Sequence, residues 1–212
     1  MTAVGAAGAD AAQTRRVIPY ADLAARVRAA PSRLGPVRLV AVDGGAGSGK
    51  TSFAARLAAA LDGAPVLHTD DLLDGWSDLE GSWQRLEAQV LEPLSAGLTA
   101  RWQRYDWLAK SFAEWHDLPV PEVLVLEGVG SARSQTQPYL SLSVWVQASR
   151  AVRVERGFAR DGPALLPPFL AWLDDEAAHH ERERTRARAD VVVDGAPLVP
   201  HNPHVGFVAL GS

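Results

Sequence analysis

Cysteine is absent from this 212-residue chain, which excludes disulfide bonds, thiolate catalysis and cysteine metal sites. Long apolar runs are missing as well, and none approaches the ~20 residues that a membrane-spanning helix needs. An excess of positive charge is also lacking, because the formal net charge of −4 gives no electrostatic case for nucleic-acid binding. The sequence therefore predicts neither a membrane nor a nucleic-acid partner.

Lysine is scarce, since among 21 basic residues only Lys50 and Lys110 are lysines and the rest are arginines. In so arginine-rich a chain, a lysine indicates a position where a compact ammonium group is wanted and a planar guanidinium would not serve. Lys50 meets this expectation through the motif described below. Lys110 is the only other lysine and is therefore also a candidate functional residue. Alternatively, it is a solvated surface lysine without a specific role.

The composition, with 47% hydrophobic and 22% charged residues, is typical of one globular domain. Residues 1–14 are small and weakly polar, and they lack the basic start and long apolar core of a secretory signal. We expect a disordered N-terminal tail on a cytoplasmic protein, followed by a single domain over residues 15–212.

The segment 37–51 fits the P-loop pattern, in which Gly44 and four further residues are followed by Gly49-Lys50-Thr51. Residues 37–42 form an apolar run that predicts a strand buried on both faces. Residues 52–61 are almost all good helix formers, so the glycine-rich turn is expected to open a helix. The alternative is an ordinary glycine-rich turn between a strand and a helix.

Strand, loop and helix together predict a phosphate site. Glycines let backbone N–H groups close around phosphate oxygens, and the start of a helix adds partial positive charge. Lys50 would reach the outer phosphates, and the hydroxyl of Thr51 would bind Mg²⁺. We assign nucleotide binding to Gly44, Gly45, Ala46, Gly47, Ser48, Gly49, Lys50, Thr51 and Ser52.

Acidic residues follow two more predicted strands. Residues 65–68 lead into Asp70 and Asp71, and residues 120–128 contain Glu127 near their end. Ligands bind beyond the carboxyl ends of parallel strands, so these carboxylates should face the same crevice as the P-loop. Asp70 is the candidate to deprotonate an acceptor hydroxyl or to hold Mg²⁺ through water, and Glu127 to position Mg²⁺. Asp71 is a weaker, acceptor-side candidate, and both aspartates could instead cap a helical turn.

A row of arginines lies on a predicted helix over residues 150–161. Arg153, Arg156 and Arg160 are three and four positions apart, so they share one side of the helix. They form either a solvated face or the charges that stabilise a transferring phosphoryl group. Glycine and prolines then break the chain, and residues 161–188 are expected to form a helical lid.

Aromatic and charged residues mingle over residues 98–115 without clean periodicity. Tyr105 and Trp107 could line an acceptor pocket next to Lys110, although aromatic clusters are more often plain core. The pair at 179–180, His-His, has no third ligand at helical spacing and is interpreted as surface. The remaining expected elements are helices over 15–30 and 79–94 and strands over 142–148, 189–195 and 204–210, the last at a sheet edge.

Five landmarks occur in one order: GGAGSGKT (44–51), HTDD (68–71), RYDW (104–107), VLEG (125–128), and RVERGFARD (153–161) followed by ADVVVDG. On these residues the chain resembles the uridine kinase and phosphoribulokinase branch of P-loop kinases. The resemblance implies an α/β P-loop NTPase fold of three layers, with flanking helices, a lid and a parallel core sheet in the order 2-3-1-4-5. It also implies transfer of the γ-phosphoryl group of ATP to a primary hydroxyl, such as the 5′-hydroxyl of uridine or cytidine.

By the same resemblance, Asp70 matches the catalytic aspartate, Tyr105 a pocket tyrosine, and the three arginines those near the lid. Lys110 stands where the family has a substrate-contacting histidine. The leading hypothesis is therefore a kinase that uses ATP and Mg²⁺ to phosphorylate a hydroxyl group of a small molecule. A nucleoside is the favoured acceptor, and the protein could form a homo-oligomer. Alternatives are a kinase of a sugar, vitamin or antibiotic hydroxyl, a nucleotide switch or ATPase without an acceptor, and a degenerate kinase with a structural role.

Overall fold

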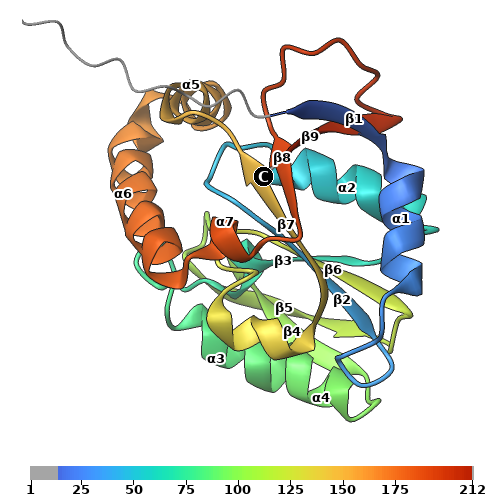
Figure 1. Cartoon of the computed structure of the whole chain (residues 1–212). Helices are drawn as coiled ribbons and strands as arrows, with labels where there is room; N and C mark the ends of the chain where they lie inside the picture. Colours follow the sequence, from blue (N-terminus) through green and yellow to red (C-terminus); the bar gives the residue numbers. More distant parts are fainter. Residues whose placement is uncertain (1–13, 212) are drawn as a thin grey trace, which may run out of the picture.

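The computed structural model describes residues 14–211, so all but the last residue of the predicted tail lies outside the described part. Its centre is a seven-stranded sheet with the strand order β1-β9-β8-β7-β2-β6-β3 (Figure 1). The strands are β1 (Arg15–Pro19), β2 (Arg38–Asp43), β3 (Val66–His68), β6 (Val123–Glu127), β7 (Leu140–Gln147), β8 (Val191–Asp194) and β9 (Gly206–Leu210).

The five strands from β3 to β8 pair in parallel, in the order β3-β6-β2-β7-β8. In chain order these are the second, third, first, fourth and fifth of the expected strands, so the sheet has the arrangement that the resemblance implied. The central strands β2 and β6 are buried along almost their whole length, which is why their sequences are continuous apolar runs.

Helices and a hairpin cover the two faces of the sheet and make three layers (Figure 1). Alternate residues of β2 divide between the faces: Val40 and Val42 pack on one side, and Leu39 and Ala41 on the other. The first face carries α1 (Tyr20–Ala29) and α2 (Lys50–Ala60), and the second carries α3 (Ser82–Leu86), a π-helical turn (Glu87–Leu91), α4 (Glu92–Ser95) and a β-hairpin.

The remaining helices follow the fourth parallel strand. They are α5 (Arg150–Asp161), a 3₁₀ turn (Pro163–Leu165), α6 (Leu166–Glu183) and α7 (Thr185–Arg188), and they include the segment expected to form a lid. Two further 3₁₀ segments, Thr69–Leu72 and Ser134–Tyr139, follow β3 and precede β7. No helix of residues 14–211 is long and apolar enough to cross a membrane.

The predicted helix over 15–30 was wrong in its first five residues, which form β1. Val17 and Ile18 are β-branched, and Pro19 lacks the N–H that a helix interior needs, so this end favours extended backbone. β1 pairs antiparallel with β9, so the predicted last strand lies inside the sheet and β1 takes the edge. The pairing joins the two ends of the described chain, a contact that local sequence cannot reveal.

Residues 98–115, where no regular element was expected, contain most of a β-hairpin. β4 (Ala100–Asp106) and β5 (Ser111–Leu118) pair antiparallel as a separate two-stranded sheet. Lys110 lies in their turn with a φ of 54°, a left-handed conformation that tight turns require. Trp102 and Tyr105 are three positions apart on β4, and the pairing register shifts between Gln103 and Tyr105, so the aromatic residues do not show the two-residue period of a regular strand.

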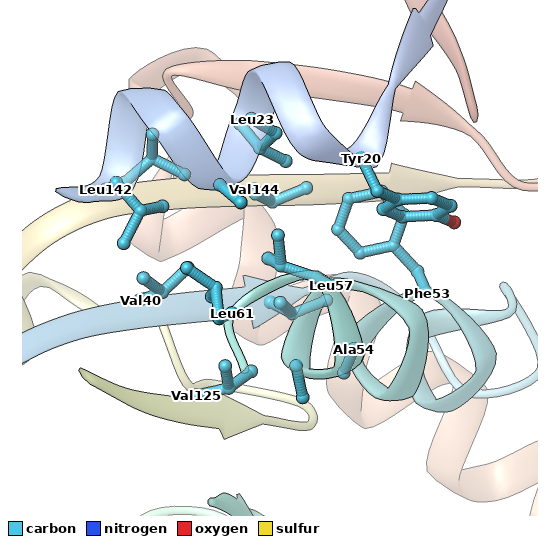
Figure 2. Close-up of a cluster of buried hydrophobic side chains, with 14 of the residues drawn as sticks. Tyr20, Leu23, Val40, Phe53, Ala54, Leu57, Leu61, Val125, Leu142 and Val144 are labelled. Atoms are coloured by element: carbon cyan, nitrogen blue, oxygen red, sulfur yellow. The ribbon is translucent and has the colours of Figure 1, made fainter. Parts of the chain in front are cut away.

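An aromatic contact joins α1, α2 and β9 on the first face. The Phe53 ring lies 5.4 Å from that of Tyr20 and 5.1 Å from that of Phe207, and Figure 2 shows Phe53 and Tyr20 side by side. Phe53 is only 4% exposed, so truncating it would leave a cavity between three elements.

We expect Phe53→Ala to lower the free energy of unfolding by about 3–5 kcal/mol, because it removes a buried ring and its aromatic contacts. Urea denaturation followed by circular dichroism measures this change. The matched control is Phe158→Ala on α5, whose ring is 47% exposed. It should change stability by about 1 kcal/mol or less. Equal losses for the two variants would contradict this packing account.

Candidate active site

The P-loop runs from the end of β2 to the start of α2, as the motif predicted. Gly49, which precedes α2, has a φ of 101°, and Gly44 and Gly47 have φ values of 142° and 77°. These conformations favour glycine. A methyl group on Gly47 would also approach the carbonyl oxygen of Arg153 to 2.7 Å. The loop is therefore held closely against α5, and its backbone N–H groups surround the start of α2.

Lys50 begins α2 and is 7% exposed. Its Nζ donates a hydrogen bond to the carbonyl oxygen of Gly45 at 3.2 Å, so the ammonium group folds back over the loop. Thr51 and Ser52 follow in the first helical turn and are exposed. The nine residues assigned to nucleotide binding thus form one continuous segment from the end of β2 into the first turn of α2.

Thr51, Glu127 and His68 meet at the carboxyl ends of β3 and β6. The Thr51 hydroxyl donates to Oε1 of Glu127 at 3.3 Å, and Nδ1 of His68 lies 2.6 Å from Oε2 of the same carboxylate. This hydrogen bond raises the pKa of His68, because it favours the charged imidazolium. Sequence reasoning had placed Thr51 and Glu127 together but had missed His68.

This arrangement fits Mg²⁺. A threonine hydroxyl and a carboxylate are oxygen ligands of the kind that Mg²⁺ prefers, and Mg²⁺ usually takes its other ligands from water and phosphate. Within residues 14–211, no three His, Asp or Glu side chains converge to hold a metal by themselves. The residues therefore suit a cation that is shared with a bound nucleotide.

Asp70 lies in the 3₁₀ turn after β3 and is exposed, although neighbouring groups surround its carboxyl group. Loss of hydration among these neighbours raises its pKa, Lys50 opposes this rise, and the charge of Glu127 adds to it. Burial also raises the pKa of Asp71, whose charged neighbours include Arg104 of the hairpin. The two aspartates thus face different surroundings.

The three arginines of α5 have different partners. Arg153 forms an ion pair with Glu176 of α6. Arg156 donates to the carbonyl oxygens of Gly47, at 3.1 Å, and Gly195, at 3.0 Å. Arg160 pairs with Asp161, a contact that raises the Arg160 pKa, and its charge acts on Asp70. The structure therefore places Arg153 and Arg156 on the P-loop and Arg160 within electrostatic range of Asp70.

Asp43 is fully buried and is a central residue that sequence reasoning missed. Its carboxylate accepts backbone N–H groups from Gly44 (2.7 Å), Gly130 (3.1 Å) and Ala132 (2.9 Å). Nε2 of His180 lies 3.1 Å from the same side chain. Burial raises the pKa of Asp43, but the contact with His180 and these N–H groups outweigh it, so the net pKa falls below 3.8. The sequence did contain a sign of this role, because Asp43 is an acidic residue at the end of the apolar strand β2, directly before the P-loop.

The prediction that the two adjacent histidines lie on the surface was wrong. His180 packs edge-on against Trp145, at 4.7 Å between ring centroids, and contacts Asp43. His179 is 1% exposed, and burial lowers its pKa. Both face inward because α6 crosses the ends of the parallel strands, which its own sequence does not show.

Tyr105 and Trp107 belong to an aromatic cluster between the hairpin and α6. The Trp107 ring lies 5.3 Å from those of Tyr105 and Trp76, and Trp76 lies 6.0 Å from Trp172 of α6. Tyr105 is buried, whereas Lys110 is exposed in the hairpin turn. The cluster thus joins the predicted acceptor residues to the lid helix.

A pocket of about 410 Å³ opens on the other side of the P-loop, between α2 and the segment after β8. Its lining includes the start of α2, and Arg156, Gly195 and His201 lie around it. It is large enough for a nucleobase and is continuous with the first residues of the phosphate cradle.

No protein-family model matches the chain, and no curated protein matches it in sequence. A solved structure of a possible uridine kinase from Bacillus stearothermophilus matches with a TM-score of 0.61 and 21% identity, over 82% of this chain and 97% of that one. A candidate fructose transport system kinase from Silicibacter sp. TM1040 gives 0.57 and 23%, over 82% and 98%. The chain therefore has the fold of P-loop kinases.

We expect Asp43→Asn to lower the free energy of unfolding by about 1–3 kcal/mol at neutral pH, since it disrupts a buried carboxylate that accepts three backbone N–H groups. The folded pKa is depressed, so the stabilisation is present above the ordinary value of 3.8 and is lost as the pH falls below it. Chemical denaturation of both proteins from pH 7 to pH 3 measures this.

The control is Asp175→Asn, which removes an exposed carboxylate of α6. It should leave stability within about 0.5 kcal/mol of the parent protein. The two proteins should become more similar in free energy of unfolding as the pH falls. A difference in free energy of unfolding that stays constant or grows would contradict the assigned role of Asp43.

Proposed function

We propose that this protein is a kinase that uses ATP and Mg²⁺ to phosphorylate a hydroxyl group of a small molecule. One observation carries the proposal: the solvent-open carboxyl of Asp70 lies within electrostatic range of both Lys50 and Arg160, beside the Thr51–Glu127 pair. A plain nucleotide-binding loop needs no such carboxylate. A carboxylate at the mouth of a phosphate cradle is suited to accept a proton from an incoming hydroxyl.

The donor side is formed by the P-loop and the pocket beside it. The loop N–H groups and Lys50 bind the phosphates, and the pocket between α2 and Gly195 accepts the base and ribose. Arg156, which bridges Gly47 and Gly195, fixes the two walls relative to each other. These residues account for ATP binding without help from the acceptor side.

Mg²⁺, when bound, neutralises charge on the phosphate oxygens during transfer. Thr51 and Glu127 are the residues that would hold it, and Asp70 is close enough to Glu127 for their charges to interact. The hydrogen bond between Thr51 and Glu127 keeps their two oxygen atoms close together. His68 steadies the other oxygen of Glu127.

Asp70 is the proton acceptor in this scheme. Loss of hydration raises the pKa of Asp70, which brings the carboxyl group closer to the range of a useful general base. Lys50 and Arg160, together with Arg153 once it turns to the phosphates, stabilise the charge on the transferring group, while Arg156 keeps its contacts with Gly47 and Gly195. The bond between the γ-phosphorus of ATP and the oxygen that bridges its β and γ phosphates breaks, and that oxygen leaves with ADP. The γ-phosphorus bonds to the acceptor oxygen, and the acceptor proton passes to Asp70.

A nucleoside is the first candidate for the acceptor. The fold match to a possible uridine kinase supports this, as do Tyr105 and Trp107, which offer aromatic surface for a base. Asp71 and Lys110 would contact the sugar or its substituents. A sugar, vitamin or antibiotic hydroxyl is the second candidate, favoured by the exposed Lys110 ammonium and by the match to a candidate fructose transport system kinase.

A panel of acceptors with ATP and Mg²⁺, followed by ADP release, tests the proposal. Uridine, cytidine, fructose and other polyhydroxylated compounds separate the two acceptor classes. ADP release that requires one acceptor supports a kinase, and the identity of that acceptor decides between the classes. ADP release at one rate with and without every acceptor would instead indicate an ATPase or nucleotide switch.

With the active acceptor in hand, Asp70→Asn should lower kcat by about 10²–10⁴-fold, because the proton acceptor is lost while the phosphate cradle is kept. Steady-state kinetics and a separate ATP-binding titration measure the two effects. Asp22→Asn, an exposed change on α1, is the matched control and should keep the parental rate. A parental kcat for Asp70→Asn would rule out Asp70 as the base.

A further inference from the structure

Glu176 of α6 reaches into the P-loop. One of its carboxylate oxygens accepts the backbone N–H of Ala46 at 2.7 Å, and the other pairs with Arg153. Glu176 is 1% exposed. A methyl group on Gly45 would lie 2.0 Å from the Arg153 guanidinium and 2.7 Å from the Glu176 carboxylate. The ion pair is therefore packed directly against the loop backbone.

The groups around Glu176 are those that bind phosphate. A backbone N–H of the cradle and an arginine contact the carboxylate, and the Lys50 ammonium is near enough to stabilise its charge. Burial raises the pKa of Glu176, and the Ala46 N–H, Lys50 and Arg153 each lower it. The same three kinds of donor hold phosphoryl groups in nucleotide sites. The carboxylate thus occupies the place of an anion in the loop.

Glu176 shares one face of α6 with two other contacts. Trp172, four residues earlier, packs on Trp76 of the aromatic cluster, and His180, four residues later, contacts Asp43. Residues at this spacing lie on the same side of a helix. Movement of Glu176 away from Ala46 therefore requires a shift of this side of α6, and that shift reaches the acceptor-side aromatic residues.

We propose that Glu176 is an internal competitor for the phosphate site, which latches α6 over the P-loop until the phosphates of a nucleotide displace it. The inference rests on the proposed function, because it assumes that the loop binds nucleotide. Displacement frees the Ala46 N–H and the Arg153 guanidinium together, so the arginine becomes available to the transferring phosphoryl group only when nucleotide has entered. The latch also links nucleotide binding to the position of Trp172.

The test compares the parent protein with Glu176→Gln by calorimetric titration of ATP with Mg²⁺. The glutamine keeps the size of the side chain but removes its charge. A latched state populated at about 90% or more lowers the apparent affinity at least tenfold, so its removal should tighten ATP binding by about tenfold or more. Glu181→Gln, an exposed change on the same helix, is the matched control and should bind ATP as the parent does.

A second measurement does not depend on the folding of Glu176→Gln. The chain has no cysteine, so Asp175→Cys places a single thiol on the exposed side of α6, where an environment-sensitive dye can be attached. Saturating ATP with Mg²⁺ should change the dye emission as α6 moves. An unchanged emission at saturation would overturn the latch.

The calorimetric outcomes separate the two proposals. The latch is supported if Glu176→Gln binds ATP more tightly than the parent protein and Glu181→Gln does not. Parental or weaker binding by Glu176→Gln, with ATP still bound by all three proteins, overturns the latch and leaves the proposed function standing. ATP binding by none of the three overturns both proposals.

Discussion

The buried carboxylate of Asp43 is the constraint on which the rest of the site depends. It accepts backbone N–H groups from the P-loop and from the loop after β6, and it contacts His180 of α6. A carboxylate this deep is stable only when its oxygens are fully hydrogen-bonded, so the three segments must stay together. The P-loop, the loop after β6 and helix α6 therefore share one fixed point.

The parallel core could be predicted because its signals are local. Continuous apolar runs such as residues 39–42 and 123–126 predict strands buried on both faces, and the glycine-rich loop with its following helix fixes the first connection. The place of β1 in the sheet could not be predicted, because its antiparallel partner β9 lies at the other end of the described chain. The hairpin was obscured because its exposed face carries both charged and aromatic residues, such as Arg101 and Trp115.

The donor half of the site follows from a contiguous motif, whereas its supporting residues come from distant parts of the chain. Glu176 and His180 belong to a helix whose charged sequence looks like a solvated lid, and only the crossing of α6 over the strand ends turns them inward. The acceptor half combines Asp70 with an aromatic cluster drawn from three elements. Helix α6 contacts the P-loop through Glu176 and the aromatic cluster through Trp172. In the proposed function, a shift of α6 on phosphate binding would therefore also move residues on the acceptor side.

The central claim is that residues 44–52 form a phosphate cradle in which Lys50 supplies the charge. Titration of ATP with Mg²⁺ into the parent protein and into Lys50→Ala tests it most directly. Because a charged hydrogen-bond donor to phosphate is lost, binding should weaken by at least about tenfold in the variant. Equal affinity in the two proteins would contradict the account.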